Sequence, residues 1–265
     1  MITRWEVNEL KVIDKGSGDP EIGVVACMHG DEKCGKHAIE RFFESNLDLQ
    51  RPVRFVIANE KAMEDGERYL DADLNRCFPG DAESNVHEEK IAAELMEELE
   101  GLNVLTMHSM KDFEEMFCLV NTLDEDLVMA PGVGKAVDVS PLGKDSIEKY
   151  LDAVSVEAGP IGTEQAAENS YQVLLNFLSY FEAIDLQGSR ETPEIFEMYE
   201  SVPGNYEFLA ENFILVEEGE KYAENYEEEL RAEEPFYPIL MSTDGYEKIL
   251  GFKGRKPVNQ LKAER

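Results

Sequence analysis

Four apolar segments rich in β-branched residues alternate along the chain with segments that have the spacing of amphipathic helices. The apolar segments are EIGVVACM (residues 21–28), VRFVIAN (53–59), NVLTMHS (103–109) and AVSVEAG (153–159). Runs of this length predict strands buried on both faces, and their alternation with helices predicts a parallel arrangement. We therefore expect an α/β fold with a mixed, mainly parallel sheet flanked by helices.

Helices are predicted over residues 35–45, 87–101 and 169–184. The second of these places Ile91, Leu95 and Leu99 on one face and has Gly101 at its C-terminal end. For the third helix, Asn169 is the expected N-cap.

The composition changes after about residue 188. Only three basic residues occur between positions 150 and 247, and short apolar runs and prolines are frequent there. We predict a main domain over residues 1–189 and a smaller β-rich C-terminal domain over 190–265. Its acidic stretch, residues 217–235, is expected to be a solvated loop or helix face rather than a binding tract.

The charge balance is the most unusual feature of the composition. The 57 acidic residues outnumber the 25 basic ones, which gives a net charge of −32. Such a chain cannot neutralise phosphates, so nucleic-acid binding is excluded. No apolar run approaches the roughly 20 residues of a membrane-spanning helix, and the N-terminus lacks a basic leader, so no membrane association and a cytoplasmic location are expected.

Acidity spread along the whole chain is tolerated best where salt screens it, which motivates the hypothesis of a halophilic source. The alternative is an ordinary acidic cytosolic protein. If the hypothesis is right, the thermal unfolding midpoint should be clearly higher in about 3 M than in about 0.1 M KCl, because the Debye length shrinks to about 3 Å at molar salt. Equal midpoints would exclude it.

Two histidines and a glutamate follow predicted strands. His29 and Glu32, in the motif HGDE, come after the first strand, and His108 ends the third. Ligands of open α/β sheets bind at the carboxyl ends of strands, and His₂Glu is a typical ligand set of catalytic zinc. The alternative is that each histidine is a structural residue.

Other polar residues cluster in the segment ERYLDADLNRCFPGD. Arg68, Asn75 and Arg76 lie there, and arginine is suited to clamp a carboxylate or a developing oxyanion. The alternative is that the arginines pair on the surface with Asp71, Asp73 or Glu67. The four cysteines have no C-x-x-C spacing, and buried reduced thiols are expected.

Glu157 lies at the end of the apolar segment VSVEAGP. A carboxylate in an apolar strand requires a partner or a function, so Glu157 is a candidate general base. The alternative is a carboxylate satisfied by loop amides.

Together, HGDE, RYLDADLNRCFPG, a strand-borne histidine and VEAGP, in this order, resemble the succinylglutamate desuccinylase/aspartoacylase family of zinc-dependent deacylases, whose fold is related to the zinc carboxypeptidases. The resemblance extends from about residue 23 to residue 160. It implies one zinc ion per chain, with His29, Glu32 and His108 as ligands. It further implies catalytic roles for Glu157 and Arg68, substrate binding by Asn75, Arg76 and Tyr246, and a C-terminal domain that borders the active site.

The chain also departs from the family pattern. Aspartoacylases have a substrate-binding arginine about ten residues before the catalytic glutamate, where this chain has Ile147, with Lys144 and Lys149 nearby. A lysine lacks the bidentate geometry of arginine, so a dicarboxylic substrate is in question. The smaller departures are Ser109 and Met110 after the zinc histidine, and Ala158 in place of valine.

The resemblance implies a zinc-dependent amidohydrolase that cleaves the amide of a small N-acyl amino acid. Its alternatives are a zinc carboxypeptidase or esterase acting on a different small substrate, and a non-catalytic ligand-binding homologue. The acyl group, the physiological metal and homo-oligomer formation are left open. His37 and His87 lie in predicted helices and are assigned no site role.

Overall fold

The structure, a computed structural model, describes residues 2–3, 10–111, 113–143, 145–243 and 248–257. The chain divides into two compact units, unit 1 (residues 1–136 and 144–194) and unit 2 (residues 137–143 and 195–265). No helix of the described part is long and apolar enough to cross a bilayer.

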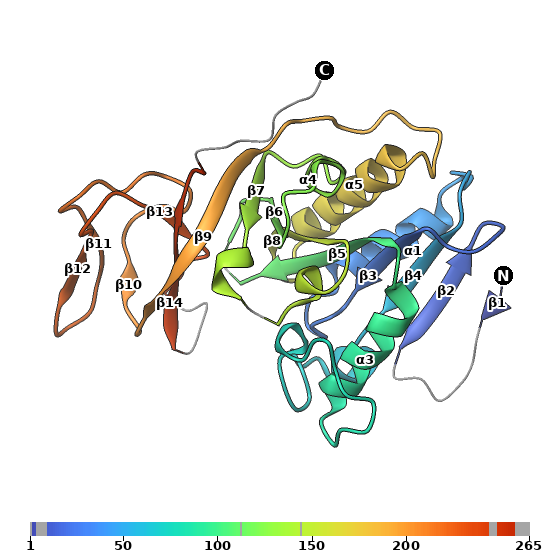
Figure 1. The fold of residues 1–265 in the computed structure, drawn as a ribbon, viewed down its shortest axis with the longest axis horizontal. Coiled ribbons are helices and arrows are strands. Elements are labelled where there is room, and N and C mark those ends of the chain that lie inside the picture. The colour runs from blue at the N-terminus through green and yellow to red at the C-terminus, as the bar shows by residue number, and fades with distance from the viewer. Residues whose placement is uncertain (1, 4–9, 112, 144, 244–247, 258–265) are drawn as a thin grey trace. The chain divides into compact units, whose positions relative to one another are not determined.

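Unit 1 is built on a mixed sheet with the strand order β1-β2-β4-β3-β5-β8-β6 (Figure 1). The central strands β4, β3, β5 and β8 run parallel, and β2 and β6 pair antiparallel at the two sides. The strands are β1 (Ile2–Thr3), β2 (Lys11–Lys15), β3 (Ile22–Ala26), β4 (Val53–Ile57), β5 (Asn103–Met110), β6 (Phe117–Val120) and β8 (Ala153–Pro160). β7 (Lys135–Asp138) lies at the boundary between the units along the chain. The expected α/β fold is confirmed.

Helices connect these strands. They are α1 (Cys34–Glu44), α2 (Glu60–Asp65), α3 (His87–Leu99), α4 (Glu125–Met129) and α5 (Glu164–Tyr180), with short 3₁₀ turns η1 (Leu74–Arg76) and η3 (Ile147–Lys149). The predicted N-cap Asn169 is wrong, because α5 begins five residues earlier. There the Thr163 side chain accepts a hydrogen bond from the Ala166 amide, and Asn169 lies inside the helix, where it donates to the Ala158 carbonyl.

The two faces of the sheet are covered by different helices. A Cβ on Gly35 of α1 would lie 2.9 Å from Met107 of β5, and a Cβ on Gly23 of β3 would lie 2.9 Å from Leu99 of α3. Side chains alternate between the faces of a strand, so His108 projects from the face opposite to Met107. The face of the sheet that α3 covers therefore carries His108.

Unit 2 is β-rich and contains β9 (Glu194–Pro203), β13 (Tyr237–Ile239) and β14 (Ile249–Arg255), which pair antiparallel in the order β9-β14-β13. A second, three-stranded antiparallel sheet consists of β10 (Glu207–Phe208), β11 (Lys221–Glu224) and β12 (Glu229–Arg231), and the turn η2 (Ser140–Leu142) also belongs to unit 2. The expectation of a loop or helix over residues 217–235 is therefore wrong, because β11 and β12 form a hairpin there. Tyr222 and Ala223 are consecutive and both buried, so β11 lacks the apolar/polar alternation that would have indicated a strand within the acidic stretch.

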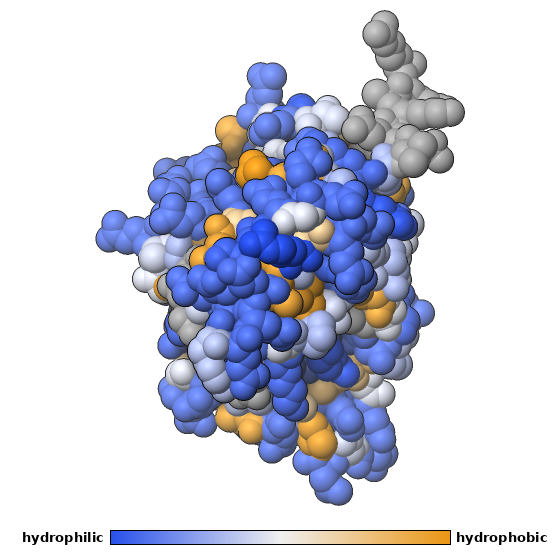
Figure 2. All heavy atoms as spheres, turned by 90° about the vertical axis from the view of Figure 1, so that its left-hand side faces the viewer, coloured by the Kyte–Doolittle hydropathy of each residue, from blue (hydrophilic) through white to orange (hydrophobic). Residues whose placement is uncertain are grey.

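The surface reflects the acidic composition. Figure 2 shows one face of the molecule, which is dominated by hydrophilic residues with small, scattered hydrophobic areas between them. Charged residues are seldom buried, so an excess of carboxylates gathers on the surface.

Candidate metal and active site

The predicted ligands meet because the strands that carry them are neighbours. β3 and β5 run parallel with Ala26 opposite Met107, so the residues that follow each position lie at the same edge. His29 comes three residues after β3 ends, and His108 lies next to Met107 within β5. The centroids of the two imidazole rings are 5.3 Å apart.

Gly30 allows the backbone after His29 to approach α2 closely. A Cβ at this position would lie 2.3 Å from backbone atoms of Ala62 and Met63, so no larger residue fits without displacement. The Gly30 amide also donates to the Arg68 carbonyl, with an N···O distance of 2.9 Å. The glycine of HGDE therefore brings the Arg68 segment against the turn that holds His29.

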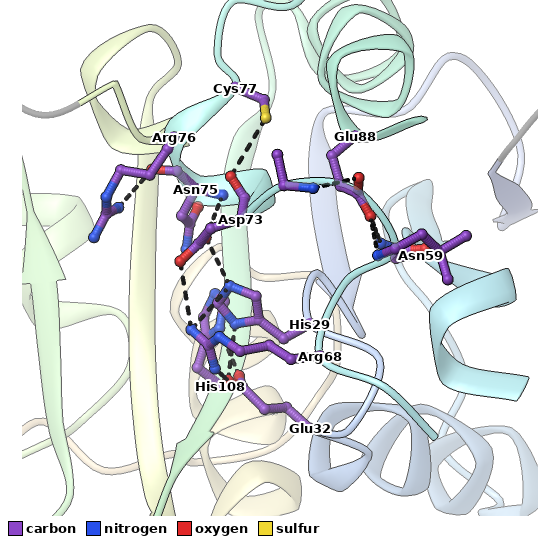
Figure 3. Close-up of polar contacts among 12 residues, drawn as sticks. His29, Glu32, Asn59, Arg68, Asp73, Asn75, Arg76, Cys77, Glu88 and His108 are labelled. Atoms are coloured by element: carbon purple, nitrogen blue, oxygen red, sulfur yellow. Dashed lines mark hydrogen bonds and ion pairs between the residues drawn. The ribbon is translucent and has the colours of Figure 1, made fainter. Parts of the chain in front are cut away.

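Glu32 lies at the centre of the site, between the two histidines (Figure 3). Nδ1 of His29 donates to Oε1 of Glu32 over 2.8 Å, and Nδ1 of His108 donates to Oε2 over 2.8 Å. All three side chains are buried, and one donor atom from each lies within 4.8 Å of the others. Among the described residues this is a candidate metal site.

The donor set fits zinc. Two imidazoles and one carboxylate are the ligands of many catalytic zinc sites, and the ligands of a tetrahedral zinc lie roughly 3.3 Å apart. Small shifts from the present 2.8 Å contacts would therefore suffice to admit an ion. Nε2 of His108 is buried and has no hydrogen-bond partner among the described residues.

The electrostatics of the cluster are dominated by Glu32. Burial opposes its ionisation, but the two histidines hold the pKa of its carboxyl well below the usual range. For His29, burial acts to lower the pKa, but the Glu32 and Asp73 carboxylates outweigh it and raise the pKa to about 9. The Glu32 carboxylate and the His29 imidazole therefore favour each other's charged forms within a buried cluster.

Asp73 completes the environment of His29, and the sequence did not identify it as a site residue. Its Oδ1 accepts a hydrogen bond from Nε2 of His29 over 3.0 Å, which directs Nδ1 toward Glu32. The same side chain accepts from the Asn75 amide at the start of η1. A carboxylate that orients a metal-ligating histidine is a common feature of metal sites. The position of Asp73 in DADLNR, two residues before Asn75, was the one feature of the sequence that could have indicated its role.

Arg68 reaches the cluster from the segment between α2 and η1. Its Nη1 donates to Oε1 of Glu32 over 2.6 Å, and its Nη2 lies 3.8 Å from Oδ2 of Asp73. Arg68 therefore pairs with the buried Glu32 as well as lying near Asp73, and does not form a surface pair with Asp73 alone. The Arg68 side chain is 43% exposed, so part of the guanidinium remains accessible.

Glu157 projects beside His108. The two residues are partners in the parallel pairing of β5 with β8, so their side chains leave the same face of the sheet. Oε2 of Glu157 is buried and has no hydrogen-bond partner among the described residues, so loop amides do not satisfy this oxygen. Burial, with a further contribution from the negative charge of Glu32, raises the pKa of Glu157 to about 7.

The remaining predicted residues lie at the margin or outside the described chain. Oδ1 of Asn75 is buried and unpartnered among the described residues, whereas Arg76 is exposed and donates to the Asn75 carbonyl over 2.6 Å. Tyr246 lies outside the described residues, as does Lys144. Ile147 is fully buried in a core cluster with Leu74, and Lys149 donates to Asp145 over 2.6 Å.

The cysteines take no part in the candidate metal site. Cys27 and Cys34 lie close to the histidines along the chain, but burial raises the pKa of both thiols, that of Cys27 to about 12. A ligating cysteine must be a thiolate, which burial disfavours. Within the described chain all four cysteines are free thiols, and only Cys77 is not fully buried.

Known proteins resemble this chain in sequence around the site. A family model described as the succinylglutamate desuccinylase/aspartoacylase catalytic domain matches residues 19–112. A probable aspartoacylase of Acaryochloris marina (strain MBIC 11017) is 34% identical over 86 residues, which is 30% of this chain and 29% of the relative. A succinylglutamate desuccinylase of Pseudomonas fluorescens (strain SBW25) is 31% identical over 98 residues, 36% of this chain and 28% of the relative. The chain thus matches less than a third of the length of these curated relatives.

Solved structures resemble the whole fold. The product-bound ectoine utilization protein EutE (DoeB) from Ruegeria pomeroyi has a TM-score of 0.73 at 18% identity, over 92% of this chain and 88% of that one. A succinylglutamate desuccinylase/aspartoacylase from Rhodobacter sphaeroides has a TM-score of 0.71 at 18% identity, over 94% and 89%. Murine aminoacylase 3 has a TM-score of 0.69 at 20% identity, over 91% and 97%. At these identities the likeness is one of fold.

Proposed function

Because this chain belongs to the succinylglutamate desuccinylase/aspartoacylase family, we propose that it is a zinc-dependent hydrolase that cleaves the amide bond of a small N-acyl amino acid. One observation carries the proposal: the buried convergence of His29, Glu32 and His108 beside the unpartnered carboxylate oxygen of Glu157. A three-residue ligand set with an adjacent base is suited to the hydrolysis of an amide.

His29, Glu32 and His108 would hold the ion, one per chain. When bound, zinc lowers the pKa of water to about 7 and polarises a carbonyl oxygen. Asp73 accepts a hydrogen bond from Nε2 of His29, so Nδ1 would be the ring atom left to bind an ion.

Glu157 is the proposed general base. A base works best when its pKa lies near the working pH, and burial raises the pKa of Glu157 to about 7. Its free Oε2 would take the proton from the attacking water and pass it to the leaving amine. Proton transfer of this kind contributes about 10²–10⁴-fold to a rate.

Arg68 is proposed to stabilise the negative charge that develops on the carbonyl oxygen. Its guanidinium is held by Glu32 yet stays partly exposed, so it retains donors for a substrate. Asn75 and Arg76 would bind the substrate carboxylate. Arg76 is exposed, and its side chain makes one hydrogen bond among the described residues, to the Asn75 carbonyl, so it keeps donors for a substrate. We also propose Tyr246 and the C-terminal domain as a border of the active site.

Neither Ile147 nor Lys149 is ready to bind the second anionic group of a dicarboxylic substrate. Ile147 is buried. Lys149 donates a hydrogen bond to Asp145, which also accepts one from the Tyr150 hydroxyl, and Lys149 would have to break its bond to reach a substrate. We therefore leave the acyl group and the amino acid open within the class of small N-acyl amino acids. A cytoplasmic setting belongs to the same proposal.

Amine release from a panel of N-succinyl and N-acetyl amino acids, at low and high salt and with and without a chelator, tests the proposal. We expect release from at least one member, loss of release with chelator, and recovery on adding Zn²⁺. Peptides and esters of the same acids form the second half of the panel. Activity confined to that half would favour a carboxypeptidase or esterase, and silence on both halves with zinc bound would contradict an enzymatic function.

A further inference from the structure

We infer that Glu88, in the first turn of α3, is a positioning residue that fixes the loop carrying Arg68 and Asp73 against the metal site. This loop, residues 66–73, is called the site loop below. The inference concerns the reaction proposed above and rests on that proposal for its catalytic consequence. The contacts themselves stand independently of it.

Glu88 is fully buried, and both its carboxylate oxygens accept two hydrogen bonds. Oε1 accepts from the Leu70 amide over 2.7 Å and from Nδ2 of Asn59 over 3.0 Å. Oε2 accepts from the amides of Asp71 and Ala72, both over 3.0 Å. Three consecutive backbone amides of the site loop thus converge on one side chain.

The site loop also accepts a hydrogen bond from the first residue of α3. Oδ2 of Asp71 accepts from the His87 amide over 2.9 Å. The N-cap residue of α3, Val86, has no side chain that could do this. The start of α3 is therefore capped by the loop that α3 itself holds, and neither can shift alone.

Asn59 connects this junction to the strand that leads to the metal site. Its side chain donates to Glu88, accepts from the Ala62 amide at the start of α2, and its own amide donates to the Cys27 carbonyl over 2.9 Å. Cys27 comes two residues before His29. The Glu88 carboxylate is thus linked, through Asn59, to the backbone two residues before His29 and, through the Ala72 amide, to the backbone directly before Asp73.

The site loop has few other constraints. Its residues from 66 to 71 are exposed. Beyond the Glu88 contacts, its backbone is bonded near its two ends: the Gly66 and Glu67 amides donate to the Ala62 carbonyl, the Gly30 amide donates to the Arg68 carbonyl, and the Arg76 amide donates to the Asp73 carbonyl. Among the described residues, the backbone of residues 69–72 has no hydrogen bond other than those to Glu88. Asp73, which orients His29, is the residue directly after Ala72. A displacement of residues 70–72 would therefore be passed to Asp73 at once.

The negative charge of Glu88 is what the four donors recognise. Burial acts to raise its pKa, but the hydrogen bonds from the amides of the loop and from Asn59 outweigh it and lower the pKa. A carboxylate is an acceptor at both oxygens, whereas glutamine presents one NH₂ group. In Glu88→Gln, two donors would face that NH₂ group without an acceptor.

Glu88→Gln should be compared with Glu89→Gln, which removes the same charge from the same helical turn without a contact to the site loop. Hydrogen exchange at the amides of residues 70–72, the Zn²⁺ dissociation constant, and kcat and KM separately should be measured on the full chain. In Glu88→Gln we expect exchange about tenfold faster or more. We also expect Zn²⁺ affinity and kcat/KM to fall by about 10–100-fold, with Glu89→Gln close to wild type.

Two results would overturn the inference. One is unchanged exchange at residues 70–72 in a folded Glu88→Gln protein. The other is faster exchange with Zn²⁺ affinity and kcat/KM equal to those of Glu89→Gln. If no substrate is found for wild type, exchange and Zn²⁺ affinity still decide the matter, so failure of the proposed function remains distinguishable.

A measurement on the wild type covers the case in which Glu88→Gln does not fold. The amides of residues 70–72 should be protected from exchange even though the loop is exposed, because they are bound to a buried carboxylate. Free exchange of these amides in the intact protein would overturn the inference without any variant.

Discussion

Glu157→Gln is expected to lower kcat by about 10²–10⁴-fold while the protein keeps its zinc. The amide is nearly isosteric with the carboxylate but cannot accept a proton from water. Because Glu157 lies beside the candidate ligand His108 and is not itself in the candidate ligand cluster, zinc binding should be retained. The measurement is steady-state turnover of the substrate found in the panel, together with the zinc content of the purified protein.

Glu148→Gln is the matched control for this variant. Glu148 is also buried, lies on η3, and accepts a hydrogen bond from Ser155, which is two residues before Glu157 in β8. Comparing the two variants thus separates the effect on turnover of losing a buried carboxylate near β8 from the effect of losing the proposed general base. Turnover of Glu157→Gln within about threefold of Glu148→Gln would refute the assigned role.

His108→Ala is expected to weaken zinc binding strongly. Mutation of a residue that only orients a metal ligand typically lowers affinity about 10–100-fold, and loss of a ligand itself should lower it further. It should also reduce kcat/KM to the level of chelator-treated wild type. The variant removes one of three donors, and the Glu32 carboxylate loses a charge-assisted hydrogen bond of 2.8 Å. Competition with a chromophoric chelator measures the affinity. Stoichiometric zinc in this variant at wild-type affinity would show that the cluster is not the metal site.

His37→Ala serves as the control, because His37 is exposed on α1 and lies outside the cluster. It should bind zinc and turn over substrate as wild type does. In addition, zinc should raise the unfolding temperature of wild type and His37→Ala but not of His108→Ala, since an ion that binds only the folded state stabilises it. Equal stabilisation of all three proteins would point to a different zinc site.

The sequence predicted the strands well because buried parallel strands are short and continuously apolar. The segment VRFVIAN contains β4, and AVSVEAG covers β8 except for its last residue, Pro160. The position of the two histidines at strand ends predicted that they would meet. The start of α5 was missed because Thr163 and Asn169 are both residue types that cap helices well. In the structure Thr163 is the cap, and the Asn169 side chain instead donates to the Ala158 carbonyl of β8.

Asp73 and Glu88 were not predicted, for a common physical reason. In a chain with 57 acidic residues, a single carboxylate has no signature that separates it from surface charge. Glu88 in the first turn of a helix is what the helix dipole favours anyway, so its local sequence hides its contacts with residues 70–72. Roles that depend on which amides a folded loop presents cannot be read from spacing.

The wide separation of the three candidate ligands along the chain bears on how the protein folds. His29 and Glu32 are three residues apart, but Glu32 and His108 are separated by 76 residues and meet only when β5 has paired with β3. Closing a segment of this length and forming parallel pairs are slow steps, and the third donor is absent until they are complete. An ion would thus join a chain whose central sheet already exists. It would slow unfolding and leave the rate of folding largely unchanged.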